Sequence, residues 1–154
     1  MRLGDLANES AASHPKPLEG VRILALEQMQ ALPYATQLLA RLGADVVKIE
    51  QPDGGDLGRG SLPAIEDPGG RRVGATFLRN NLDNHSVCID LKAPAGRELV
   101  LRLAPAFDVI AENLKSGALA RMCPVYSDIQ AVHPAAVYLS ISGFGNTVES
   151  PYGA

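Results

Sequence analysis

The chain has 154 residues, of which 46% are hydrophobic and 20% are charged, and its formal net charge is −3. This composition is typical of one globular domain with a sizeable core, and it excludes a disordered chain. Because there is no basic run and no apolar stretch of membrane-spanning length, we expect neither a nucleic-acid partner nor a membrane partner.

Residues 1–16 are small, polar and proline-containing, and they are predicted to form a flexible arm before a domain that runs from 17 to 154. The arm lacks the apolar core of an export signal, so we expect a cytoplasmic protein. Two cysteines, Cys88 and Cys123, fit a reducing compartment. Cys88 lies within a strand pattern, and we expect it to be a small core residue.

Residues 21–50 form the best-defined unit of the sequence, with a strand, a helix and a second strand. Val21–Leu26 is an apolar run of strand length, suited to burial on both faces. Pro33 suits the first position of the following helix, and Gly43 suits the residue just after its end. Val46–Glu50 is the second strand. This order predicts a βαβ unit and a parallel sheet.

Ligands of such sheets bind beyond the carboxyl ends of the strands. That rule indicates Glu27–Leu32 and the residues that follow Glu50. The second of these segments opens a long polar, glycine-rich stretch, Gln51–Gly74. Loops of that length are functional or disordered, and both a functional loop and a mobile surface loop stay open here.

The rest of the chain alternates predicted strands and helices. The further strands are Ser86–Asp90, Phe107–Ile110 and Ala136–Ile141. The helices are one that starts weakly at Ala93, then Ala118–Met122 and Tyr126–Val132, while Ala75–Asn80 is either a helical turn or a strand edge. Ser142–Gly145 follows as a glycine turn. The predicted fold class is therefore α/β, with a parallel Rossmann-like sheet and flanking helices.

Six groups of residues occur in an order and spacing that resemble one family. They are Ala31 with Pro33, Ala35–Gln37, Leu42–Val46 and Lys48–Glu50; Pro52, Gly55, Asp56 and Arg59; Asp90–Lys92 with Gly96 and Arg97; Glu112–Leu114; Gly117 and Arg121; and Ser140–Gly145. Together they resemble the amino-terminal part of the family III CoA-transferases, which include formyl-CoA transferase, the carnitine CoA-transferases and α-methylacyl-CoA racemase. The resemblance covers about residues 17–152.

The resemblance implies acyl-CoA or CoA as the ligand. In the transferases an aspartate carboxylate attacks the thioester and forms a mixed anhydride, which divides one acyl transfer into two easier steps. Racemase members instead move the α-proton with a His and Asp pair. In both branches the catalytic acids follow the Gly-Phe-Gly turn, and this sequence ends at Ala154. We therefore assign no catalytic residue and expect the isolated chain to be inactive.

By resemblance, six residues are candidates for contacts with CoA: Met29, Gln30, Ala31, Asn113, Leu114 and Arg121. The first three precede a helix N-terminus, where free N–H groups favour anions. A plain βα turn is the alternative for these three, and a solvated arginine is the alternative for Arg121. No spacing of histidines and acids fits a metal site.

Several departures from the family pattern weaken this predicted CoA-binding site. Leu32 replaces a glycine that would permit close backbone approach. Asn84 and His85 replace two cations, and Gln51 replaces an arginine of formyl-CoA transferase. Fewer cations predict weak binding of a multiply charged ligand.

Two interpretations follow from the sequence. One is a transferase or racemase domain, acting as a homo-oligomer or with a complementing chain. The other is a non-catalytic α/β binding or interaction module. A dinucleotide-binding domain is disfavoured because no Gly-x-Gly-x-x-Gly follows the first strand.

Overall fold

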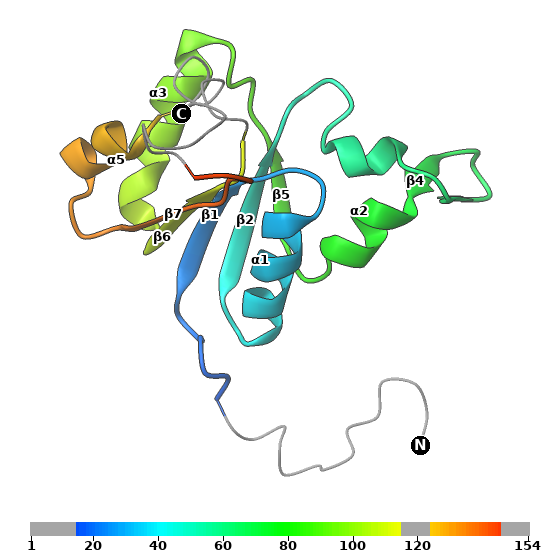
Figure 1. Cartoon of the computed structure of the whole chain (residues 1–154), viewed down its shortest axis with the longest axis horizontal. Helices are drawn as coiled ribbons and strands as arrows, with labels where there is room; N and C mark the ends of the chain where they lie inside the picture. Colours follow the sequence, from blue (N-terminus) through cyan, green and yellow to red (C-terminus); the bar gives the residue numbers. More distant parts are fainter. Residues whose placement is uncertain (1–14, 115–123, 146–154) are drawn as a thin grey trace.

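The computed structural model describes residues 15–114 and 124–145. In this part of the chain, five parallel strands form one sheet in the order β5-β2-β1-β6-β7 (Figure 1). The strands are β1 (Arg22–Leu26), β2 (Asp45–Glu50), β5 (His85–Cys88), β6 (Val109–Glu112) and β7 (Val137–Ser140). The predicted α/β fold class is confirmed, and the predicted strand ends lie within two residues of the observed ones.

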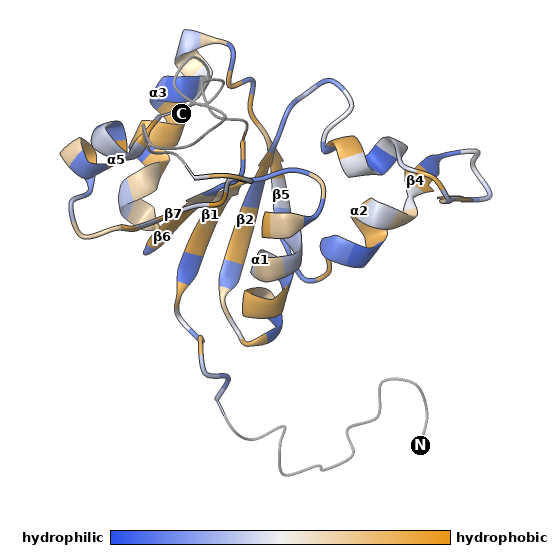
Figure 2. Cartoon of the chain, in the orientation of Figure 1, coloured by the Kyte–Doolittle hydropathy of each residue, from blue (hydrophilic) through white to orange (hydrophobic). Residues whose placement is uncertain are grey.

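Helices cover both faces of the sheet. Helix α1 (Ala31–Arg41) packs on one face, and α3 (Pro94–Leu103) packs with α5 (Tyr126–Val132) on the other. The central strand β1 is therefore buried on both sides after Arg22, and from Ile23 to Leu26 it is continuously apolar (Figure 2). Its Ile23 and Ala25 belong to the core under α1, and Leu24 and Leu26 belong to the core under α3 and α5.

The strand order reverses direction beside β1. From β1 the chain passes through α1 to β2 and then to β5, all on one side. It then crosses through α3 to the other side of β1 and adds β6 and β7. The chain consequently leaves the carboxyl ends of β1 and β6 toward different helices. Open α/β sheets hold ligands at such a point.

The long stretch after β2 has regular structure. It contains the 3-10 helix η2 (Leu57–Gly60) and a hairpin of β3 (Ala64–Glu66) and β4 (Arg72–Gly74). The prediction of one long loop without regular structure is thus wrong for this segment. The hairpin leads into α2 (Ala75–Asn80), so the helical alternative for that segment is confirmed.

The ends of α1 partly match their prediction. The helix begins at Ala31, so Pro33 lies at the third helical position and the expected first position is wrong. Its missing N–H still causes no loss, because the first turn has no intrahelical acceptors for its N–H groups. Gly43 has φ +109° just past the helix, as a C′ glycine should.

Later elements test the remaining predictions. Helix α5 has the predicted bounds, and α3 begins after Ala93 with no side-chain cap, as expected. Cys88, however, is exposed, and its expected place in the core is wrong. It lies on β5, which is the edge strand and is exposed at all four residues. The predicted helix Ala118–Met122 lies outside the described residues.

Within residues 15–114 and 124–145, every helix is too short or too polar to cross a membrane.

Candidate functional site

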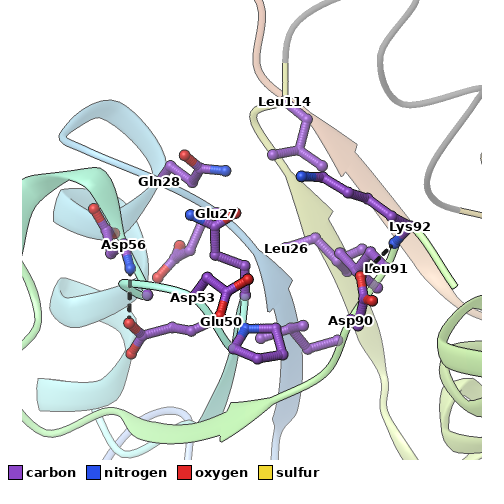
Figure 3. Close-up of a pocket in the computed structure, with 14 residues that line it drawn as sticks. Leu26, Glu27, Gln28, Glu50, Asp53, Asp56, Asp90, Leu91, Lys92 and Leu114 are labelled. Atoms are coloured by element: carbon purple, nitrogen blue, oxygen red, sulfur yellow. Dashed lines mark hydrogen bonds between the residues drawn. The ribbon is translucent and has the colours of Figure 1, made fainter.

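A cavity of about 210 Å³ opens at the carboxyl ends of β1, β2 and β5 (Figure 3). Leu26, Ile49, Pro52, Leu91 and Leu114 give it apolar walls. Its location agrees with the rule that ligands bind beyond the strand ends. The polar part of its lining is mostly acidic and consists of Glu27, Gln28, Glu50, Gln51, Asp53, Asp56, Asp90 and Lys92.

Lys48 lies fully buried behind this wall. Its ammonium pairs with the Asp56 carboxylate, donates to Asn81 Oδ1 at 2.6 Å and lies 3.8 Å from Glu27 Oε1. All three charged side chains are at most 1% exposed. With both carboxylates ionised this trio would carry one excess negative charge in a region shielded from water.

The structure relieves that excess at Glu27. Burial raises the pKa of Glu27, while Lys48 and the Thr36 hydroxyl lower it by a smaller amount, and the result is about 7. Thr36 Oγ1 lies 2.8 Å from Glu27 Oε2. Near neutral pH the Glu27 carboxyl is therefore divided between its protonated and ionised forms, which removes part of the excess negative charge of the trio.

Glu50 behaves in the opposite way. Burial opposes its ionisation, but hydrogen bonds from Arg59, Ser86 and the Asp56 backbone outweigh this effect and lower its pKa to about 2. The Arg59 guanidinium binds both carboxylate oxygens at 2.7 Å and stacks 3.7 Å from the Phe77 ring centroid. Glu50 is thus ionised near neutral pH, and Arg59 of η2 neutralises its charge.

The turn between β1 and α1 has an unusual backbone. Met29 has φ +67°, a left-handed conformation that costs a residue with a β-carbon about 1–2 kcal/mol. The Asn113 side chain binds both main-chain groups of Gln28, the residue before Met29. Its Oδ1 accepts from Gln28 N at 2.9 Å, and its Nδ2 donates to Gln28 O at 3.0 Å. Asp56 accepts from Met29 N at 3.1 Å.

The N-terminus of α1 follows directly. The first intrahelical bond runs from Tyr34 N to Gln30 O, so the N–H groups of Ala31 and Leu32 precede it and Pro33 has none. No acidic residue lies in this first turn. These N–H groups can donate hydrogen bonds to an anion.

The six residues predicted to contact CoA have different places. Leu114 lines the cavity, and Glu112 Oε2 fixes it by accepting its N–H at 2.9 Å. Met29, Gln30 and Ala31 form the turn and helix start beside the cavity, without lining it. The amide of Asn113 is used to hold Gln28. Arg121 lies outside the described residues.

The departures from the family pattern also find their places. Leu32 is buried in the core under α1, so its side chain does not reach the cavity. Asn84 and His85 lie at the amino end of β5, with His85 Nε2 3.8 Å from Asp45 Oδ1. They lie at the other end of the strand from the cavity and do not line it, and their expected effect on phosphate binding stays a prediction. Only Gln51 lines it.

Two further lining residues differ in how far the sequence predicted them. Gln28 lies within the predicted segment Glu27–Leu32, whereas Lys92 was missed; Figure 3 shows the Lys92 side chain extending toward Leu114. Lys92 follows the end of a predicted strand, so the strand-end rule applied to every strand would have found it. The buried Lys48 had a signal too, because it is a charge within an otherwise apolar strand.

Comparisons with known proteins agree with the resemblance. The sequence pattern of CoA-transferase family III matches residues 18–153. A succinate–glutarate CoA-transferase of Agrobacterium fabrum is 40% identical over 138 residues, which are 88% of this chain and 34% of that protein. A formyl-CoA:oxalate CoA-transferase of a Bradyrhizobium species is 43% identical over 130 residues, which are 84% of this chain and 30% of that protein.

A solved structure gives the same result. The crystal structure of a CAIB/BAIF family protein from Brucella suis superposes with a TM-score of 0.79 at 38% identity, over 90% of this chain and 36% of that one. The chain thus spans about a third of the length of the curated relatives it matches.

Proposed function

Because this chain belongs to CoA-transferase family III, we propose that its strand-end cavity binds the coenzyme A part of an acyl-CoA thioester. The observation that carries the proposal is the coincidence of the cavity with the start of α1 at the carboxyl edge of the sheet. In the proposal the chain contributes to moving CoA between an acyl-CoA and a carboxylic acid through an aspartyl anhydride.

The size of the cavity indicates which portion of CoA it takes. At about 210 Å³ it is smaller than the roughly 300–1,000 Å³ of complete ligand pockets. Apolar walls of Leu26, Ile49 and Leu91 suit a flat heterocycle, and the carboxylates at its rim suit ribose hydroxyl and amino donors. We assign it to the adenosine portion, with the diphosphate passing over the N-terminus of α1.

The charges near the cavity support this division. Lys48 and Arg59 neutralise Asp56 and Glu50 from within the wall, so these carboxylates repel an anion less than their number implies. Lys92 is the cation among the described lining residues. In the proposal its ammonium meets the phosphate on the ribose.

A second candidate function is CoA binding without catalysis by this chain. This candidate is favoured because each buried carboxylate already has a partner: Glu50 is bound by Arg59, Asp56 by Lys48, and Glu27 by Thr36. A nucleophilic carboxylate needs a free oxygen lone pair directed at the thioester carbon.

Titration of the purified chain with CoA tests the binding proposal. Lys92→Ala should weaken CoA binding about fivefold, because one exposed charge pair is worth roughly 1 kcal/mol. The same substitution should leave the affinity for dephospho-CoA unchanged, since that ligand lacks the ribose phosphate. Added salt should reduce the difference between the two ligands.

Arg102→Ala is the matched control, because Arg102 is an exposed cation near the carboxyl end of α3, about 12 Å along the helix from its start. CoA binding that is equally tight in the Lys92 variant and the control would place the phosphate elsewhere. No measurable CoA binding by the unaltered chain would refute the proposed function.

We also propose that the chain binds a second copy of itself. Tyr34, Leu38 and Leu42 recur every four residues along α1 and are each at least 40% exposed. Such an exposed apolar stripe is typical of an interface. Sedimentation should show a mass that rises with concentration, and Leu38→Glu should reduce it to the monomer mass. A monomer at every concentration would contradict the proposal.

A further inference from the structure

The turn between β1 and α1 is held entirely by side chains from elsewhere in the chain. Its four main-chain groups at Gln28 and Met29 each have a side-chain partner. Asn113 binds both groups of Gln28, Asp56 accepts from Met29 N, and Asn80 Nδ2 donates to Met29 O at 3.4 Å.

These partners come from three distant parts of the sequence. Asn113 follows β6, Asp56 precedes η2, and Asn80 ends α2. Asn113 and Gln28 lie on opposite sides of the point where the strand order reverses, so their paired hydrogen bonds join the carboxyl ends of β1 and β6. Asp56 is itself fixed by Lys48 and by Gly58 N at 2.6 Å.

The bonds oppose the backbone preference of Met29. A free chain would favour negative φ at a methionine, and the turn would then direct the following N–H groups elsewhere. The left-handed value in the structure therefore depends on the three partners.

We propose that Asn113, Asp56 and Asn80 are positioning residues. They set the Gln28–Met29 turn, before any ligand arrives, so that the N–H groups of Ala31 and Leu32 face the CoA diphosphate. Fixing a binding element in advance raises affinity because less freedom is lost on binding. The proposal rests on the proposed function for its ligand, and it assigns Asn113 a role distinct from direct contact with CoA.

Asn113→Ala is the first variant, because Asn113 is half-buried and its removal leaves the Lys48 cluster intact. CoA affinity should fall about tenfold, which corresponds to about 1.4 kcal/mol. The midpoint of urea unfolding should change little. A direct contact between Asn113 and CoA would give a similar loss, so the variant alone does not separate the two roles.

A second substitution separates them. Asparagine adopts positive φ several-fold more readily than methionine, so Met29→Asn favours the turn without outside help. In that background, Asn113→Ala should reduce affinity less than threefold, because the two substitutions act through one backbone conformation. Equal losses in both backgrounds would overturn the positioning role.

A readout without ligand keeps this proposal separate from the proposed function. A positive φ brings the amide and α protons of one residue close together, which gives a strong intraresidue nuclear Overhauser effect at Met29. We expect it in the free, unaltered chain and a marked weakening in Asn113→Ala. Persistence of the full signal in the variant would overturn the inference even if CoA binds nowhere.

Discussion

Replacing Lys48 by methionine is expected to lower the free energy of unfolding by about 3–5 kcal/mol. Methionine matches the length of the lysine side chain, so the change removes the charge and little volume. Asp56 then remains buried with no cation, and Glu27 loses its nearest positive charge. Urea unfolding monitored by circular dichroism measures the effect.

Arg71→Met is the control for this substitution. Arg71 also pairs with a carboxylate, Asp67, but its side chain is 86% exposed. An exposed pair contributes roughly 0–1 kcal/mol, so the control should stay near the stability of the unaltered chain.

Adding Asp56→Asn to Lys48→Met should cost less than the sum of the two single losses. Full additivity, or equal losses in Lys48→Met and the control, would show that the buried pair is not coupled.

The second large effect is a dependence of stability on pH that originates at Glu27. Its pKa is about 7 in the folded chain and 4.5 in the unfolded one. Between these values the folded state holds a proton that the unfolded state has released. The contribution of Glu27 to the free energy of unfolding is therefore fully present below about pH 4.5. It is lost as pH rises through 7, by roughly 3 kcal/mol in total.

Glu27→Gln removes the titration and keeps a hydrogen-bonding partner for Thr36. The variant should gain stability relative to the unaltered chain as pH rises from 5 to 8, and the two should converge near pH 5. Glu50 does not contribute to the pH dependence between pH 5 and 8, because its lowered pKa of about 2 affects stability only as pH falls from 4.5 toward 2. A constant difference between variant and parent across that range would show that Glu27 is ionised throughout.

Much of the fold could be predicted because its signals are local. The apolar run of β1 and the glycine after α1 each mark one element within a few residues of sequence. The strand-end rule then gave the edge of the sheet where the cavity lies. These patterns depend on burial and backbone freedom, which short stretches of sequence encode directly.

Predictions failed where a property depends on distant partners. Whether Cys88 is buried depends on what covers β5, and the sequence of the strand does not contain that information. Asn113 and Gln28 are 85 residues apart, and nothing in either local pattern predicts their paired bonds. The resemblance directed attention to Asn113 as a CoA contact, which stays a prediction, and the structure shows its amide bonded to Gln28.

The site residues show the same division. Leu114 was predicted by resemblance and lines the cavity. The raised pKa of Glu27 could not be predicted, because it arises from burial that outweighs the opposing effect of a lysine on the neighbouring strand.

Asp56 has one further consequence, which concerns local unfolding. Its carboxylate serves the loop through Gly58, the strand through Lys48 and the turn through Met29. Detaching η2 from the sheet would break all three links in one event, and it would leave a buried ammonium exposed to hydration. We therefore expect the cavity wall and the turn to open together, as one subglobal unit. Warming then changes the fraction of molecules that can bind, while each molecule that can bind keeps the same intrinsic affinity.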